Sequence, residues 1–100
     1  MPFFAVLFED DAARADAVRQ RHMAEHLAFL EGHAGVVHAA GPLREPLDGT
    51  PAGGLWLVEA ADSDTVDTLV RSDPFWLTGL RRSVRVLAWT QVFADGKRRI

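Results

Sequence analysis

The chain has 100 residues, of which 48% are hydrophobic and 25% charged, and its formal net charge is −3. This length and composition predict one folded domain and exclude a disordered or collagen-like chain. Because there is no cysteine, a disulfide scaffold, a thiol nucleophile and a thiolate-bound metal are excluded, and the cytoplasm is the expected location.

The first half of the chain predicts a strand, a long helix and a second strand. Residues 3–9 form a continuous apolar run of strand length. Asp10 and Asp11 follow at a position where negative charge favours the start of a helix. Residues 12–32 contain no proline and stop at a glycine, which predicts a long helix, and residues 35–40 predict a short strand.

A loop, a strand and a second helix are expected next. Residues 41–54 hold four glycines and three prolines, which predicts a long loop. Residues 55–60 are apolar at both odd and even positions and predict the third strand. Residues 62–71 then predict a helix with Asp62 or Ser63 as its N-cap.

The last quarter of the chain completes the predicted fold. Asp73 and Pro74 suit the N-cap and the first turn of a short helix that reaches about Leu80, and residues 83–93 predict a fourth strand. The resulting order, β-α-β-β-α-β, is that of the ferredoxin-like α+β fold, an antiparallel sheet with helices on one face. In that fold the first and third strands are interior. We assign residues 1–95 to this domain and residues 96–100 to a polar C-terminal tail.

The predicted sheet has apolar side chains on both faces. In the first strand Phe4, Val6 and Phe8 alternate with further apolar residues, and the last strand is similar. A sheet with helices on only one face would expose a large apolar surface to water. We therefore expect a homodimer that packs sheet to sheet and forms a dimeric α/β barrel.

Positive charge is concentrated at the C-terminal end. Residues 1–80 carry 5 basic and 13 acidic side chains, whereas residues 81–100 carry 6 basic and 1 acidic. The basic residues fall into two clusters, one beginning at Arg81 and one at Lys97, separated by an apolar strand pattern. We interpret both clusters as solvated strand ends and expect no nucleic-acid partner. No apolar run approaches the ~20 residues of a membrane span, so no membrane partner is expected either.

Three large polar side chains lie on the apolar side of the long predicted helix. At about 100° per residue, Arg19, His22 and His26 fall within the arc that also holds Val18 and Phe29. Buried histidines often only hydrogen-bond to the backbone. Two histidines and an arginine on adjacent turns instead favour a polar pocket between the helix and the sheet.

Two histidines of this helix also belong to a possible metal-site motif, and Asp73 has two alternative roles. His22-Met23-Ala24-Glu25-His26 matches the H-x-x-E-H string of some zinc proteases, but Glu25 faces solvent and no third ligand is evident, so no metal is expected. Asp73 is either only an N-cap or a carboxylate that orients an imidazole ring. In the second case Trp76 or Phe75 walls the pocket.

The combination of these residues resembles the YCII-related (YciI-like) family. Arg19-x-x-His22-Met23 resembles its R-x-x-H-L motif, Ala40-Gly41-Pro42 its A-G-P motif, and Asp73-Pro74-Phe75 with Gly79 its D-P-[YF]…G motif. The segment between His22 and Gly41 is slightly longer than is usual in the family. The resemblance implies a ferredoxin-like dimeric barrel and, in some relatives, a lyase that removes HCl from chlorinated hydroxylated aromatic compounds.

The resemblance also implies roles for individual residues. His22 and Asp73 are the expected catalytic pair, and Arg19, Gly41 and Pro42 the expected pocket edge. His26 and Trp76 lie outside the shared motifs and are expected at the substrate site. Which of His22 and His26 is the working histidine stays open.

Two hypotheses of different class follow. In the first, the chain is a small enzyme without a cofactor, in which a His–Asp pair acts as general base and acid and Arg19 binds an anionic oxygen of a small cyclic or aromatic substrate. The chain has no thiol nucleophile, phosphate-binding loop or dinucleotide fingerprint, which favours elimination or isomerisation. In the second, it is a non-catalytic dimer that binds a ligand or a protein partner.

Overall fold

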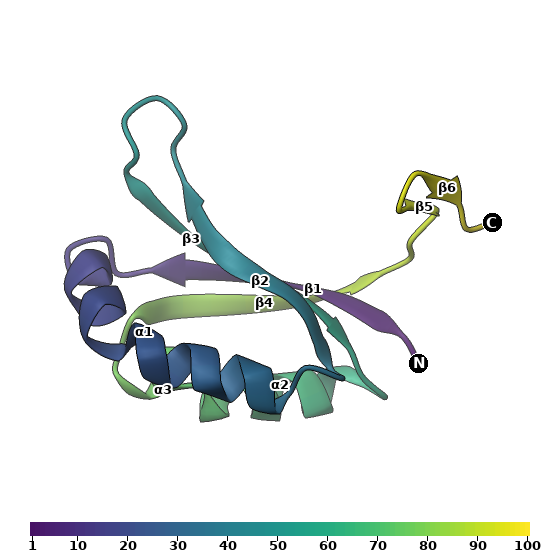
Figure 1. The fold of residues 1–100 in the computed structure, drawn as a ribbon, viewed down its shortest axis with the longest axis horizontal. Coiled ribbons are helices and arrows are strands. Elements are labelled where there is room, and N and C mark those ends of the chain that lie inside the picture. Colours follow the sequence, from purple (N-terminus) through teal and green to yellow (C-terminus); the bar gives the residue numbers. More distant parts are fainter.

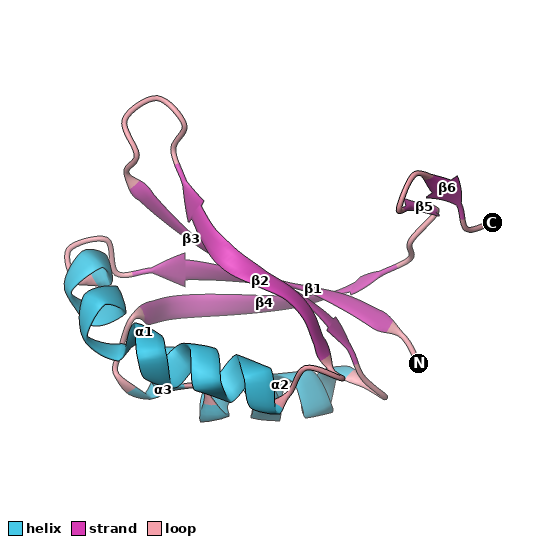
Figure 2. Cartoon of the chain, viewed as in Figure 1, coloured by secondary structure: helices cyan, strands magenta, loops and turns pink.

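A computed structural model covers residues 1–100 and contains a four-stranded antiparallel sheet with three helices on one face (Figures 1 and 2). The strand order β2-β3-β1-β4 makes β1 and β3 the interior strands, as predicted. The mixed α+β architecture with ferredoxin-like element order is confirmed. The strands of this sheet are β1 (Phe3–Asp10), β2 (Val37–Arg44), β3 (Pro51–Glu59) and β4 (Arg81–Trp89), and the helices are α1 (Ala15–Gly32), α2 (Ser63–Ser72) and α3 (Pro74–Leu77).

The core lies between the sheet and the helices. Successive side chains of a strand point to opposite faces, so alternate residues of β1 and β3 are buried. Phe4, Val6 and Phe8 of β1 pack there with Trp56 of β3 and Val66 of α2. Each large apolar side chain that is fully buried contributes roughly 1.5–3 kcal/mol. This layer fixes the helices over the sheet.

The N-terminus of α2 has the cap that the sequence predicted. Asp62 Oδ1 accepts a hydrogen bond of 2.8 Å from the backbone N–H of Thr65, and one of 2.7 Å from the Thr65 hydroxyl. These two hydrogen bonds, the backbone one being the stronger influence, lower the pKa of Asp62 below its usual value of 3.8. Asp62, rather than Ser63, is therefore the N-cap.

The predicted long loop over residues 41–54 is wrong. Strands β2 and β3 extend into this segment, where Pro42 is opposite Gly54 and Arg44 is opposite Pro51, and only residues 45–50 connect them. The prolines are tolerated because β2 is an edge strand and Pro51 is the first residue of β3. Figure 1 shows this hairpin extending beyond the rest of the sheet.

The C-terminal segment also differs from prediction. Strand β4 ends at Trp89 rather than at residue 93, and a small hairpin follows it, formed by β5 (Phe93–Ala94) and β6 (Lys97–Arg98). This hairpin lies away from the helices at the end of an extended arm (Figure 1). None of the helices is long and apolar enough to cross a membrane. The cytoplasmic location stays a prediction.

Candidate active site

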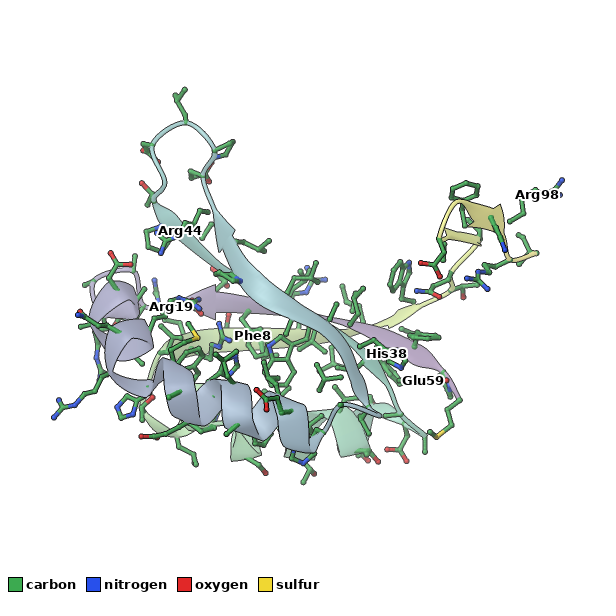
Figure 3. All side chains as sticks on the ribbon, viewed as in Figure 1. Phe8, Arg19, His38, Arg44, Glu59 and Arg98 are labelled. Carbon is green, nitrogen blue, oxygen red and sulfur yellow. The ribbon has the colours of Figure 1, made fainter.

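One carboxylate joins two buried arginines where α1 meets the sheet. Asp10 is the last residue of β1, Arg19 belongs to α1 and Arg81 begins β4. Arg19 Nη2 donates to Asp10 Oδ2 at 2.6 Å, and Arg81 Nη1 donates to Asp10 Oδ1 at 2.9 Å. Figure 3 shows Arg19 on α1 at the side of the helix that faces the sheet. The side chains of Asp10 and Arg81 are only 1% and 3% exposed.

The sequence interpretation of two of these residues is wrong. Asp10 was expected at the start of the helix and Arg81 at a solvated strand end. Antiparallel pairing of β1 with β4 instead places Asp10 opposite Arg81, and the two opposite charges compensate each other in the interior. Antiparallel pairing of the first and last predicted strands would have placed Asp10 near Arg81. This pairing was the signal that could have predicted their contact from the sequence.

The Arg81 guanidinium packs against Phe8, and the absence of a side chain at Gly54 leaves space for it. It lies over the Phe8 ring at 4.1 Å from the ring centroid, and a Cβ on Gly54 would come within 2.9 Å of Arg81 Nη1. Burial lowers the pKa of Arg81, and the hydrogen bond and charge of Asp10 only partly oppose that effect. The charge of Arg19 lowers this pKa further.

A histidine and a second buried carboxylate adjoin this cluster. His26 Nδ1 of α1 lies 2.7 Å from Asp73 Oδ1, and the two side chains are 8% and 2% exposed. We assign the proton to Nδ1, because an ionised carboxylate can only accept. The Phe75 ring stacks on the imidazole at 4.0 Å with an interplanar angle of 17°. Asp73 and Phe75 thus fix the ring, and Nε2 makes no hydrogen bond within the chain.

The predicted pairing of His22 with Asp73 is wrong, because His26 occupies that place. His22 Nδ1 is instead 3.3 Å from Glu25 Oε2 at the surface, and its side chain is 24% exposed. His26 follows Arg19 by seven residues, nearly two full turns, so the two lie on one stripe of α1. His26-Leu27 also supplies the leucine of the R-x-x-H-L motif and shortens the long segment before Gly41, a signal that the sequence already contained, although Met23 then stands at the arginine position of the motif.

The other predicted site residues divide into two groups. Gly41 and Pro42 of β2 line the same cavity as His26 and Arg19, as expected. Trp76 does not line it, because its ring lies beneath the Arg71 guanidinium at 4.7 Å and packs against the apolar core. Asp73 makes no side-chain cap to α3, so its carboxylate serves His26 instead.

The cavity between α1 and the sheet has a volume of about 80 Å³. Both charged and apolar side chains line it. Sequence reasoning missed Arg81 and Trp56 among its lining residues. The cavity is lined by Arg19, Met23, His26, Leu27, Leu30, Ala40, Gly41, Pro42, Trp56 and Arg81.

The H-x-x-E-H string does not form a metal centre in this structure. His22 and His26 contact different partners, Glu25 and Asp73 respectively. No group of three histidine, aspartate or glutamate side chains is placed to hold a metal ion.

Comparison with known proteins identifies the family of the chain. A family model of the YCII-related domain matches residues 2–90. The chain belongs to the YCII-related family. No curated protein sequence matches it.

One solved structure resembles this YCII-related chain over most of its length. It is 5-chloro-2-hydroxyhydroquinone dehydrochlorinase (TftG) from Burkholderia phenoliruptrix AC1100, in complex with 2,5-dihydroxybenzoquinone. The TM-score is 0.77 and the sequence identity 27%, with 88% of this chain and 93% of that chain covered. The similarity to a dehydrochlorinase supports a small enzyme built on this fold.

Proposed function

We propose that this YCII-related protein is a small cofactor-independent lyase or isomerase in which His26 and Asp73 act as one general acid–base pair. The observation that carries this proposal is the 2.7 Å contact between two buried side chains beside a cavity. A carboxylate on Nδ1 fixes the tautomer, stabilises the imidazolium and leaves Nε2 as the base.

The reaction proposed for the site is elimination of HCl from a chlorinated, hydroxylated aromatic compound. The similar TftG structure is a dehydrochlorinase, and its bound compound is a dihydroxybenzoquinone. In this reaction a proton moves from one hydroxyl group to the ring carbon that bears chlorine, and that hydroxyl becomes a carbonyl. A second hydroxyl then loses its proton to His26 Nε2 as the C–Cl bond breaks, so that a second carbonyl forms and chloride leaves, while Arg19 binds the oxygen that carries negative charge. No electron acceptor is needed.

Turnover of 5-chloro-2-hydroxyhydroquinone, measured as released chloride, tests this proposal. We expect His26→Gln to lower kcat/KM by roughly 10²–10⁴, which is the usual contribution of a positioned general base. His22→Gln is the matched control on the same helix, and it should keep the wild-type rate because His22 contacts Glu25 at the surface.

The rates of chloride release, together with ligand binding, distinguish an enzyme from a non-catalytic binding protein. Equal rates in the wild type and His26→Gln contradict the general-base role. If the wild type releases no chloride above buffer but binds 2,5-dihydroxybenzoquinone, the dehydrochlorinase proposal fails and the non-catalytic alternative is supported.

We further propose that two copies pair through the sheet face opposite the helices. Alternating residues of the strands give this face a half-buried apolar surface that includes Leu57, Leu87 and Trp89, the last two each 38% exposed. Leu87→Glu should turn a dimer into a monomer in sedimentation experiments. Leu47→Glu is the control, because Leu47 lies at the hairpin tip and is 98% exposed. A wild type that sediments as a monomer contradicts the proposal.

A further inference from the structure

The cluster around Asp10 has two guanidinium groups and one carboxylate. Asp10 pairs with both Arg19 and Arg81, while the second buried carboxylate, Asp73, pairs with His26. The two guanidiniums therefore share the one carboxylate of Asp10, and the charge of Asp73 acts on Arg81 more weakly than that of Asp10. A buried charge is costly in a medium of low dielectric unless it is paired and its hydrogen bonds are satisfied.

The hydrogen bonds of the two arginines are also incomplete. Each guanidinium has five N–H donors. Arg19 uses only Nη2, toward Asp10 and toward the Gly53 carbonyl oxygen at 3.4 Å, and Arg81 uses only Nη1. The Nε atoms of both arginines are buried without an acceptor. Such unsatisfied buried donors are uncommon in folded proteins.

Both arginines line the cavity that contains His26. From the shared carboxylate, the unused donors and this position we infer that Arg81, together with Arg19, binds one anionic oxygen group of the ligand, so that the substrate enters as an organic anion such as a carboxylate, phenolate or enolate. This inference rests on the proposed function of the same cavity and adds Arg81 as a residue that determines specificity.

The apolar part of the cavity suits the remainder of such a ligand. Trp56, Leu27 and Leu30 line the cavity together with the two arginines and His26. An apolar or aromatic body bearing one anionic oxygen group matches this mixture of side chains. With that anion bound and His26 protonated, the three positive groups are balanced by Asp10, Asp73 and the ligand.

An NMR titration with benzoate and benzamide tests the inference directly. The two probes have nearly the same shape, but only benzoate is charged. We expect benzoate to shift the side-chain N–H signals of Arg81 and Trp56, and benzamide to bind at least roughly tenfold more weakly, because hydrogen bonds to charged groups contribute more than neutral ones.

Variants identify the arginine responsible. Arg81→Met should weaken benzoate binding roughly tenfold to a hundredfold. Arg82→Met is the matched control, since it removes the same charge from the exposed neighbouring residue of β4 and should leave affinity within about twofold. Arg81→Lys keeps the charge with fewer donors, and intermediate affinity is expected even if the methionine variant does not fold.

Three results would overturn the inference. These are equal affinity for benzoate and benzamide, unchanged benzoate affinity in the folded Arg81 variants, and no shift with either benzoate or the smaller anion formate. Failure of the proposed function is distinguishable, because it shows as unchanged turnover in His26→Gln while charge-selective binding still depends on Arg81.

Discussion

Removal of the Asp10 carboxylate by Asp10→Asn tests whether the arginine cluster is a true interior ion network. Asp10 contacts Arg19 at 2.6 Å and Arg81 at 2.9 Å, with its side chain 1% exposed. At an effective dielectric constant of ~20, two unit charges ~4 Å apart interact with about 4 kcal/mol. Two such attractions are lost in the variant, while the desolvation cost of the carboxylate, several kcal/mol, is recovered.

We therefore expect Asp10→Asn to lower the free energy of unfolding by about 3–5 kcal/mol. This is a large part of the ~5–15 kcal/mol available to a small domain, and it corresponds to a fall in melting temperature of at least ~12 °C. Urea unfolding at constant m-value is the measurement. Asp16→Asn is the control, because the Asp16 side chain is 78% exposed and pairs with Arg44 only at the surface.

The double variant Asp10→Asn/Arg81→Met sharpens this test. It leaves one buried guanidinium without a carboxylate instead of two, so the double variant should be more stable than Asp10→Asn alone. Additive effects of two destabilising substitutions would give the opposite result. A change below about 1 kcal/mol for Asp10→Asn, which is typical of a solvated surface pair, refutes the reasoning.

Three further predictions concern the His26–Asp73 pair, Gly53 in the β2–β3 hairpin and the Asp62 cap of α2. At alkaline pH, nitrogen NMR should find the neutral His26 ring protonated at Nδ1, and Asp73→Asn should abolish that preference; an unchanged tautomer contradicts the role of the 2.7 Å contact. Gly53→Ala should destabilise the fold by about 1–3 kcal/mol or more, because Gly53 has φ +117° and a Cβ there would overlap the Phe8 carbonyl oxygen, whereas Gly41→Ala meets nothing within 4 Å and should change stability by less than about 1 kcal/mol in the same urea experiment. The pKa of Asp62 is lowered in the folded state by hydrogen bonds from Thr65, so its ionised form stabilises α2 above pH 3.8 and this contribution is lost as pH falls through the folded pKa. The difference in melting temperature between wild type and Asp62→Ala should therefore shrink as the pH falls below 3.8, and a constant difference contradicts the cap.

The candidate site could be predicted only in part from the sequence. The helical periodicity of residues 12–32 correctly placed Arg19 and His26 toward the sheet, because positions on one helix are related by a fixed rotation. The same wheel also admitted His22, which lies at the surface beside Glu25. The angular position of a residue around a helix does not say which neighbouring element lies beside its turn. Helical periodicity alone could therefore not decide whether His22 or His26 pairs with Asp73.

Local patterns determined the order of the elements and limited the cap of α2 to Asp62 or Ser63, since both depend on residues close together in the chain. The interior position of β1 and β3 followed from that order, because it is the arrangement of the ferredoxin-like fold. Tertiary structure decided which charges are buried and which histidine meets a carboxylate. His26 and Asp73 are 47 residues apart, and Asp10 and Arg81 are 71 apart. Such contacts depend on strand register and on the position of α1 over the sheet, which no short segment specifies by itself.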